Sequence, residues 1–482
     1  MTGLLMAGTS SDAGKSLLVA GLCRVARRRG IKVAPFKAQN MSNNSMVCAD
    51  GSEIGRAQYL QAIAAGITPS SILNPVLLKP GSDRRSFIVL RGQPHGTLEA
   101  GEYATGRRHL ADAANAAYRE LAADYDLVIA EGAGSPAEIN LRDGDYTNMG
   151  LARAFGLPVV VIGDIDRGGV LASLYGTWAL LDDADRALLA GYLINKFRGD
   201  QAILNPGLAE ITRRTGLASF GVIPWLPGMW VDGEDALEVG RWRGEAANSA
   251  RTAGLHVAVV RLPRISNATD VDALAHEPGV HVTVTTDPAT VAAADLAVLP
   301  GSRSTLTDLA WLRETGIADA VAARAAAGRP VLGICGGFQM LTRTITDPVE
   351  AGHDGAVDGL GLLPGDTRFH PDKTLGRPTG QWRGVPAEGY VIHHGRVTVD
   401  DGQEPFLDGL RSGAVYGTMW HGALESDEFR RAWLTEVAAT AGADWQPTAA
   451  PGFGERRETM LDVVADALAN HADVDALLAL AR

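Results

Sequence analysis

Apolar and polar positions along the first half of the chain form a pattern that predicts strands and helices in turn. Between the strand-like runs lie longer segments with apolar residues three and four positions apart, such as residues 16–30, as expected for helices packed on one face. Short apolar runs typical of buried strands occur at residues 4–8, 32–36, 126–132, 158–164, 191–195 and 220–224. Buried strands that alternate with helices indicate a parallel sheet covered on both faces, so we expect an α/β unit here.

The pattern stops between residues 226 and 253 and then resumes, which predicts a second α/β unit. After about residue 440, the apolar spacing of residues 460–471 predicts a closing helical segment. Strand-like runs of the second unit occur at residues 255–263, 295–302, 329–337, 388–397 and 414–422. The predicted division is therefore a first domain at 1–226, a linker at 227–253, a second domain at 254–440 and a helical segment at 441–482.

Composition narrows the class of protein. A chain of 482 residues with 46% hydrophobic and 21% charged residues is typical of a globular protein with two or three domains. No apolar run reaches the roughly 18 residues of a membrane span, and no signal peptide is recognisable at the start, so we expect a cytoplasmic protein. Three cysteines are too few for a disulfide framework. A formal charge of −12 argues against a nucleic-acid partner.

The first strand-like run leads into a glycine-rich loop, residues 8–16, with the sequence GTSSDAGKS. Backbone N–H groups at the start of the following helix can surround a phosphate, while Lys15 reaches the β- and γ-phosphates and Ser16 holds magnesium. The spacing is unusual, because Gly8 and Gly14 enclose five residues where the common phosphate-binding loop has four. A simple glycine turn with an incidental lysine remains the alternative interpretation.

Two further side chains are expected at the same edge of the sheet. Lys37 and Glu131 each follow a predicted strand, and ligands of open α/β sheets bind beyond the carboxyl ends of the strands. We therefore expect Lys15, Lys37 and Glu131 to converge on one crevice.

The enlarged loop resembles that of the dethiobiotin synthetase-like ligases, which phosphorylate a carboxylate with ATP so that a nitrogen nucleophile can attack it. The resemblance extends to EGAGS at 131–135 and LINKF at 193–197. It implies that Glu131 and Ser16 are Mg²⁺ ligands, that Asn195 reads the adenine edge, and that Asp50 is a weaker candidate for the metal. The ATP-binding residues implied in this way are Gly8, Thr9, Asp12, Gly14, Lys15, Ser16, Lys37 and Asn195.

A more specific resemblance covers most of residues 3–225. The stretches PFKAQNMSNNS, GSEIGRAQ, NPVLLKPGSDRRS and GDIDRGGVLASLYGT are similar, in order, to signature stretches of the cobyric acid synthase family of cobalamin biosynthesis. The resemblance implies ATP- and Mg²⁺-dependent amidation of the b, d, e and g carboxylates of adenosylcobyrinic acid a,c-diamide. Cations and amide donors in these stretches could bind the acidic corrin: Asn40, Asn43, Arg84, Arg85 and Arg167, with Asp166 assisting.

The second unit carries a candidate nucleophile. Cys335 lies between an apolar run and a helical pattern, flanked by glycines, in the sequence RPVLGICGGFQML. Such a sharp turn exposes a side chain at a helix N-terminus, which favours the thiolate and supplies N–H donors for an oxyanion. His421, at the end of a later strand-like run, is the expected base.

These stretches resemble the class I glutamine amidotransferases of the cobyric acid synthase type. The resemblance implies that Cys335 and His421 are catalytic and that Gly301, Gly336 and Gln339 form the oxyanion and glutamine-binding site, with L-glutamine as substrate. Many class I members have a glutamate two positions after the histidine, where this chain has Ala423. A third member of the triad is therefore absent or supplied elsewhere, and the resemblance leads us to expect a cysteine–histidine dyad. His393 and His394 are expected to be structural or to face substrate.

Two other functions are compatible with parts of the pattern. Cobyrinic acid a,c-diamide synthase shares both domain types, but the sequences of residues 34–45 and 164–170 favour the cobyric acid enzyme. A ParA/MinD-like ATPase switch would need a second lysine early in the phosphate-binding loop, and residues 9–13 contain none. The amidotransferase stretch would also be unexplained by an ATPase switch.

Overall fold

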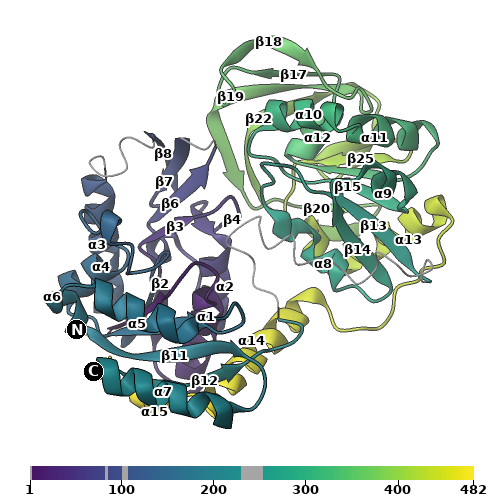
Figure 1. Cartoon of the computed structure of the whole chain (residues 1–482). Coiled ribbons are helices and arrows are strands. Elements are labelled where there is room, and N and C mark those ends of the chain that lie inside the picture. Colours follow the sequence, from purple (N-terminus) through teal and green to yellow (C-terminus); the bar gives the residue numbers. More distant parts are fainter. Residues whose placement is uncertain (1–2, 82–84, 100–106, 230–252, 482) are drawn as a thin grey trace. The chain divides into compact units, whose positions relative to one another are not determined.

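The computed structural model describes residues 3–81, 85–99, 107–229 and 253–481 (Figure 1). Contacts divide the chain into two units, which are described separately. Unit 1 contains residues 1–42, 48–232 and 457–482, and unit 2 contains residues 43–47 and 233–456. Most of the predicted linker, 227–253, lies outside the described residues. Among those that are described, no helix is both long and apolar enough to cross a membrane.

Unit 1 is built on a six-stranded parallel sheet in the order β12-β11-β10-β1-β9-β2. Its strands are apolar and buried over most of their length, which is why the sequence pattern located them. The strands are β1 (Gly3–Gly8), β2 (Val33–Phe36), β9 (Leu127–Glu131), β10 (Val159–Asp164), β11 (Leu189–Phe197) and β12 (Ala218–Pro224). The helices of this unit that precede residue 230 are α1 (Lys15–Arg28), α2 (Arg56–Ala65), α3 (Arg108–Asp124), α4 (Met149–Phe155), α5 (Val170–Leu180), α6 (Asp183–Arg186) and α7 (Gln201–Thr215).

A second, smaller sheet in unit 1 is not in the sequence prediction. Its order is β3-β6-β7-β8, with β3 parallel to β6 and the other pairs antiparallel. The strands are β3 (Gln39–Met41), β6 (Val76–Pro80), β7 (Arg85–Leu90) and β8 (Gln93–Glu99), and β5 (Glu53–Gly55) lies outside this sheet. Several of these strands are short or partly exposed, so their residues do not form the apolar runs that mark the main sheet.

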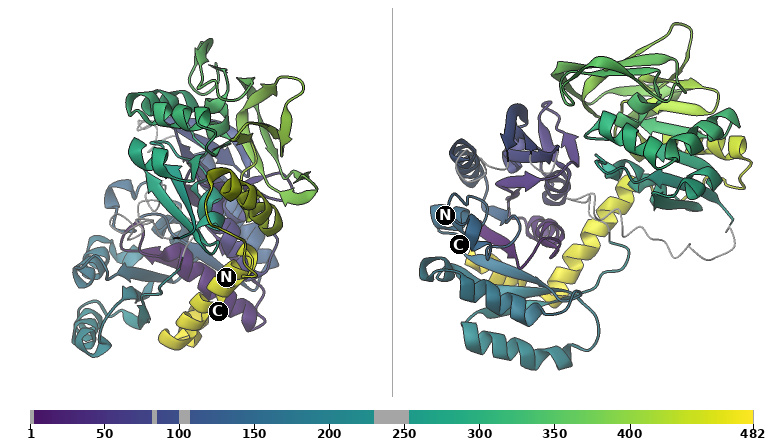
Figure 2. Two further views of the ribbon diagram at one scale, coloured as in Figure 1. Left: turned by 90° about the vertical axis from the view of Figure 1, so that its right-hand side faces the viewer. Right: turned by 45° about the horizontal axis from the view of Figure 1, so that its top comes forward.

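The end of the chain returns to unit 1. Helices α14 (Phe453–His471) and α15 (Val474–Leu480) place apolar side chains in the same core as α1. The backbone N–H of Asp473 donates to the carbonyl of Phe220 in β12. In Figure 2 the yellow C-terminal helices lie along the purple and teal elements of this unit. The core of unit 1 is therefore assembled from both ends of the sequence.

Unit 2 has a seven-stranded sheet in the order β14-β13-β15-β16-β25-β24-β23. The first five strands are parallel, and β24 and β23 extend the edge in antiparallel fashion. The strands are β13 (Leu255–Val260), β14 (Val280–Thr285), β15 (Leu296–Leu299), β16 (Val331–Ile334), β23 (Glu404–Phe406), β24 (Gly409–Ser412) and β25 (Val415–Thr418). The helices are α8 (Asp272–Ala275), α9 (Pro288–Ala293), α10 (Thr305–Glu314), α11 (Ile317–Ala326), α12 (Gly336–Leu341) and α13 (Asp427–Ala441).

A four-stranded sheet, β18-β17-β19-β22, and the hairpin of β20 and β21 complete unit 2. The strands are β17 (Thr344–Asp347), β18 (His353–Asp358), β19 (Gly365–Gly376), β20 (Thr379–Trp382), β21 (Val385–Glu388) and β22 (Val391–Val399). The short strand β4 (Ser45–Val47) also belongs to this unit, although it lies in sequence between β3 and β5 of unit 1. The α/β class with parallel main sheets in both halves is confirmed.

Candidate functional site

The loop between β1 and α1 has the shape expected of a phosphate-binding loop. Gly14 adopts a left-handed backbone conformation (φ 91°, ψ 22°) at the N-cap of α1. The ammonium of Lys15 donates to the carbonyl oxygens of Ser10 at 2.9 Å and Gly134 at 3.2 Å. It therefore lies across the loop, where it can neutralise the charge of a bound phosphate.

Glu131 is the centre of a buried network at the carboxyl end of β9. The Ser16 hydroxyl and the Lys37 ammonium both donate to its Oε1 atom, each at 2.8 Å, and the Gln61 amide donates to Oε2 at 2.6 Å. Glu131 is fully buried, and Lys37 is 2% exposed. The predicted convergence is thus directly visible for Lys37 and Glu131, while Lys15 contacts Gly134 in the loop after the same strand.

The donor set fits a hard divalent cation. Mg²⁺ prefers oxygen ligands and usually keeps waters and substrate phosphates among them. The Ser16 hydroxyl and the Glu131 carboxylate already meet in space. Within the described ranges, no group of three or more His, Cys, Asp or Glu side chains forms a metal site by itself. A cation held by Ser16 and Glu131 would take its remaining ligands from nucleotide phosphates and water.

The other side of the loop is held by polar contacts. The Arg167 guanidinium pairs with the Asp12 carboxylate at 2.9 Å, and the Lys196 ammonium donates to the Asp12 carbonyl at 2.6 Å. The Asn195 side-chain amide donates to the carbonyl of Ala13 at 2.9 Å, so it supports the loop. The N–H of Thr9 donates to the carbonyl of Ile162, which joins the loop to β10. A Cβ atom at Gly8 would lie 3.1 Å from the Lys15 ammonium.

The residues expected to bind the corrin are placed as follows. Asn40 in β3 is buried and donates to Gln58 at 3.0 Å, whereas exposed Arg85 stacks on Phe87. Asp166 lies 3.6 Å from Arg198. Asn43 belongs to unit 2 by its contacts, and Arg84 lies outside the described residues.

Asp50, the weaker candidate for the metal, stabilises a local turn. Its Oδ1 atom accepts hydrogen bonds from the backbone N–H of Ser52 at 2.9 Å and from the Ser52 hydroxyl at 2.6 Å. The residue itself is exposed. These contacts fix the Asp50 carboxylate in the turn, and its role as a metal ligand stays a prediction.

Cys335 lies at the sharp turn between β16 and α12. Its backbone has φ 49° and ψ −105°, a conformation that non-glycine residues rarely adopt. The turn is held on the strand side, where the N–H of Cys335 donates to the carbonyl of Thr418 in β25 at 2.8 Å. Strand, strained turn and helix are the arrangement that presents a nucleophile to substrate.

His421 follows β25, and its ring lies near enough to Cys335 for that residue to act on its pKa. Its ring Nδ1 atom lies 2.7 Å from Oδ2 of Asp270, and the N–H of Gly422 donates to Oδ1 of the same carboxylate at 2.8 Å. Both His421 and Asp270 are almost fully buried. The structure therefore provides an acidic partner for the histidine where a dyad was expected.

The electrostatics of this group favour the imidazolium. Burial alone lowers the pKa of His421, but the charge of Asp270, its contact with the ring and the electrostatic interaction with Cys335 outweigh burial and raise the pKa to about 10. A charged histidine beside a thiol is the arrangement that activates a cysteine nucleophile.

Two glycines make room for this group. A Cβ atom at Gly301 would lie 2.9 Å from the His421 ring, and one at Gly336 would lie 2.6 Å from the backbone nitrogen of Ser302. Both distances are too short for a side chain. The loop after β15 therefore packs directly on the turn that carries Cys335, where its peptide groups can face a developing oxyanion.

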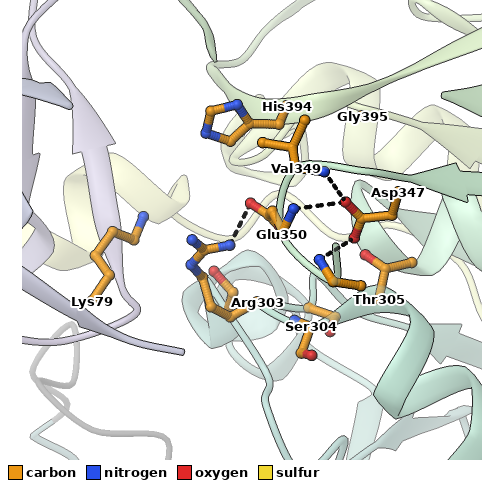
Figure 3. A network of polar contacts seen from close by, with 12 residues as sticks. Lys79, Arg303, Ser304, Thr305, Asp347, Val349, Glu350, His394 and Gly395 are labelled. Carbon is orange, nitrogen blue, oxygen red and sulfur yellow. Dashed lines mark hydrogen bonds and ion pairs between the residues drawn. The ribbon is translucent and has the colours of Figure 1, made fainter. Parts of the chain in front are cut away.

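Gln339 is fixed on both sides of its amide. Its Nε2 donates to the carbonyl of Gly395 at 3.2 Å, and its Oε1 accepts from the Thr305 hydroxyl at 3.1 Å. Figure 3 shows Thr305 and Gly395 beside a further polar network, in which the buried carboxylate of Asp347 accepts from backbone N–H groups including that of Glu350 at 2.8 Å. Arg303 forms an ion pair with Glu350. These contacts fix Gln339 against Thr305 and Gly395, and they join Arg303 to the turn at residues 347–350.

The two histidines of β22 differ in their surroundings. Burial and the charge of His421 lower the pKa of His393 to about 4. The Nδ1 atom of His394 lies 3.0 Å from the carbonyl of His370, and burial also lowers its pKa. Both are therefore neutral near pH 7, which leaves His421 as the charged histidine next to Cys335.

Comparison with known proteins agrees with the two sites. Residues 256–429 match the CobB/CobQ-like glutamine amidotransferase domain, and residues 4–233 match the CobQ/CobB/MinD/ParA nucleotide binding domain. The cobyric acid synthase of Cutibacterium acnes (strain DSM 16379 / KPA171202) is 68% identical over 100% of both chains. Those of Mycolicibacterium gilvum and Mycolicibacterium vanbaalenii are 57% and 58% identical, over 100% of this chain and 97% of theirs.

The chain belongs to the cobyric acid synthase family. Its nucleotide-binding domain, in a family of ligases, indicates that ATP is used. The family resemblance given by the motifs of residues 35–45 and 164–170 is thereby confirmed.

Two residues of these sites, Asp270 and Gln61, are not among those predicted from the sequence. Asp270 lies in a short 3-10 turn, Ala268–Val271, far in sequence from both Cys335 and His421. Gln61 lies in α2, three positions after the quoted motif GSEIGRAQ. No local pattern marks either residue, because each acquires its role only when distant segments meet.

Proposed function

We propose that the chain catalyses the ATP- and glutamine-dependent amidation of the b, d, e and g carboxylates of adenosylcobyrinic acid a,c-diamide. The observation that carries the proposal is the buried group of Cys335, His421 and Asp270 in a chain that also holds the phosphate-binding loop with its Ser16–Glu131 contact. One site would release ammonia, and the other would activate a carboxylate for it. A cytoplasmic location, where glutamine and ATP are both plentiful, is part of this proposal.

In the amidotransferase site, the Cys335 sulfur would attack the side-chain carbon of glutamine and form a γ-glutamyl thioester. His421 would give a proton to the departing nitrogen, so that the C–N bond breaks and ammonia leaves. Peptide N–H groups near Gly301 and Gly336 would stabilise the oxyanion, and Gln339 would keep the pocket in shape. Water would then hydrolyse the thioester and release glutamate.

In the nucleotide site, ATP would supply the phosphoryl group that activates a carboxylate. Lys15 and the N–H groups at the start of α1 would hold its phosphates, and Ser16 and Glu131 would hold Mg²⁺. Lys37 would keep Glu131 in place and face the negative charge of the phosphoryl group during its transfer. Asn195 would border the nucleotide, and Asn40, Asn43, Arg84, Arg85, Asp166 and Arg167 are the candidates for the corrin.

The test compares two variants with two nitrogen sources. Purified protein is incubated with ATP, MgCl₂, adenosylcobyrinic acid a,c-diamide and either glutamine or a high concentration of ammonium at mildly alkaline pH, and amidations are counted by mass spectrometry. We expect four amidations with either source in the unaltered protein. Cys335→Ala should lose the reaction with glutamine and keep it with ammonium, whereas Lys15→Ala should lose both.

Other outcomes would contradict the proposal in different ways. Glutamine-dependent activity in folded Cys335→Ala would mean that another group is the nucleophile. Ammonium-dependent activity in Lys15→Ala would remove the phosphate role. Two amidations of cobyrinic acid, with none of the a,c-diamide, would identify the chain as a cobyrinic acid a,c-diamide synthase.

A further inference from the structure

The loop that carries Asp270 is fastened by a segment from a distant part of the sequence. Residues 43–47 belong to unit 2 by their contacts, yet the residues before and after them belong to unit 1. The chain leaves β3 at Met41, contributes these few residues to unit 2, and returns to unit 1 from Cys48 onward. We call residues 43–47 the strap.

Four hydrogen bonds join the strap to residues 266–268. The side-chain carboxamide oxygen of Asn267 accepts from the backbone N–H of Ser45 at 2.9 Å. The backbone N–H of Asn267 donates to the carbonyl of Asn43 at 3.4 Å. The Ser266 hydroxyl donates to the same carbonyl at 3.0 Å. The N–H of Ala268 donates to the Asn44 side chain at 3.1 Å. Asn44, Ser45, Ser266 and Asn267 are all buried, so these bonds are protected from water.

Asn267 links the strap to Asp270 and adopts a left-handed backbone conformation (φ 52°, ψ 48°). Its carbonyl accepts from the N–H of Asp270 at 3.0 Å, which closes the turn that points the carboxylate at His421. Such a conformation persists in a non-glycine residue when surrounding contacts hold it. Here the strap supplies those contacts through the side chain and the backbone of the same residue.

The same loop also touches the oxyanion side of the site. The N–H of Ser266 donates to the carbonyl of Gly301 at 2.8 Å, and Ile265 forms an isolated bridge with Ser302. A displacement of residues 265–270 would therefore disturb both the histidine partner and the loop that packs on Cys335.

From this arrangement we propose that Asp270 is the positioning residue of His421 and that the strap holds it there, which couples glutamine hydrolysis to the nucleotide-binding unit. Both ends of the strap continue into that unit. A rearrangement of β3 or of the residues after Cys48 would therefore be transmitted through the strap to the Asp270 loop. The inference rests on the proposed function, because it assumes that Cys335 and His421 hydrolyse glutamine.

The Asp270 part is tested by the pH dependence of glutamine hydrolysis. The groups that face His421 are Asp270, Cys335, His393, Asp408 and the stacked ring of Tyr390. Asp270→Asn keeps the size of the side chain and removes its negative charge, so the pKa of His421 falls and the limb of the pH profile assigned to it moves to lower pH. We expect kcat to fall by about 100-fold with a much smaller change in KM. Asp270→Glu should recover part of the rate.

The strap part is tested at Asn267 with a matched pair of variants. Asn267→Gly tolerates the left-handed backbone but lacks the oxygen that accepts from Ser45, whereas Asn267→Asp keeps that oxygen. Glutamate release is measured for each protein with and without ATP, MgCl₂ and the a,c-diamide. We expect these additions to raise the rate several-fold in the unaltered protein and in Asn267→Asp. In Asn267→Gly the rate should be lower by about tenfold and the ratio should fall to about one.

The midpoint of thermal unfolding and the rate of ammonium-dependent amidation serve as controls, and both should be unchanged in Asn267→Gly. An unaltered pH profile in Asp270→Asn would overturn the positioning role, and an unaltered rate and ratio in Asn267→Gly would overturn the strap. If the additions do not raise the rate in the unaltered protein, the coupling is wrong. Each of these results differs from a failure of the proposed function, which would appear as glutamine hydrolysis by Cys335→Ala.

Discussion

Glu131 has two roles that a substitution can separate. It is fully buried and is the carboxylate partner of Lys37, and it is also the proposed Mg²⁺ ligand. Glu131→Gln should lower the free energy of unfolding of unit 1 by about 3 kcal/mol, because Lys37 keeps a buried charge without its carboxylate partner. It should also abolish ATP-dependent amidation. Thermal unfolding monitored by circular dichroism gives the first quantity.

The double variant Lys37→Met/Glu131→Gln tests this division. It removes the buried charge, so stability should largely return, while amidation should stay absent because the carboxylate ligand is still missing. Recovery of amidation together with stability would assign Glu131 a purely structural role.

His393 should make unit 2 sensitive to mild acid. Its pKa is 6.5 in an unfolded chain and is lowered to about 4 in the fold, chiefly by burial. Between these values the unfolded state binds more protons than the folded state, so stability is lost as the pH falls from about 6.5 towards 4, by up to about 1.4 kcal/mol per pH unit. Above pH 6.5 the group contributes no pH dependence.

Urea unfolding at a series of pH values measures this effect. His393→Gln should have a shallower loss of stability in that range than the unaltered protein. His353→Gln, at an exposed position on β18, is the matched control and should keep the original slope. Equal slopes in all three proteins would contradict the assignment to His393.

At the residue scale, the sequence was most informative where one residue lies in a distinctive local pattern. Cys335 between glycines at a strand–helix turn, and Lys15 in a glycine-rich loop, were both predicted with a physical reason. Asp270 was not, because its neighbours ATDVD carry no signature and its carboxylate meets His421 only after β13 and β25 are in one sheet. Tertiary contacts of this kind cannot be deduced from spacing in a single sequence.

At the element scale, helix α1 depends on Gly21 for its contact with α14. A Cβ atom at Gly21 would lie 2.6 Å from a methyl group of Val464 and 2.7 Å from one of Leu468. Gly21→Leu should therefore destabilise unit 1 by about 2 kcal/mol through overpacking. Gly21→Ala meets a smaller clash and gains about 1 kcal/mol of helix propensity, so its net effect should be near zero.

Thermal unfolding of the two Gly21 variants provides the comparison. Gly176→Ala in α5, where the structure places no atom within 4 Å of the added carbon, is a control for the change of helix propensity alone. Equal stability of Gly21→Leu and Gly21→Ala would mean that α14 can shift away from α1 without loss.

Elements were predictable in proportion to their burial. The parallel strands β1, β9, β10 and β16 are buried at every position, and each coincides with an expected apolar run. By contrast, β18 and β20 are mostly exposed and contain glycine, aspartate or glutamine, so no apolar period marks them. Antiparallel edge sheets depend on pairing partners, and those partners are not visible in the strand's own sequence.

At the scale of the whole molecule, the apparent N-terminal domain is incomplete without the end of the chain. Apolar residues of α14 and α15, including Leu461, Leu468 and Leu477, belong to the core that also contains Leu22. A fragment of residues 1–233, which spans the matched nucleotide-binding region, should therefore unfold without cooperativity or aggregate. Joining residues 1–229 to residues 453–482 through a flexible linker should restore a cooperative thermal transition.

A matched fusion tests whether the effect depends on packing. The same fusion protein with Leu461 and Leu468 changed to aspartate keeps the added length but loses the apolar contacts, so it should behave like the short fragment. A cooperative transition in residues 1–233 alone would show that the C-terminal helices are dispensable.

The return of α14 and α15 to unit 1 also sets the order of events on the ribosome. The loop of residues 8–16 and helix α1 are synthesised before residues 233–456, whereas the helices that cover α1 are synthesised after them. A chain whose synthesis stops shortly after residue 456 therefore contains all of unit 2 but lacks part of the core of unit 1. Such products would expose the apolar face of α1 and become substrates for chaperones and proteases.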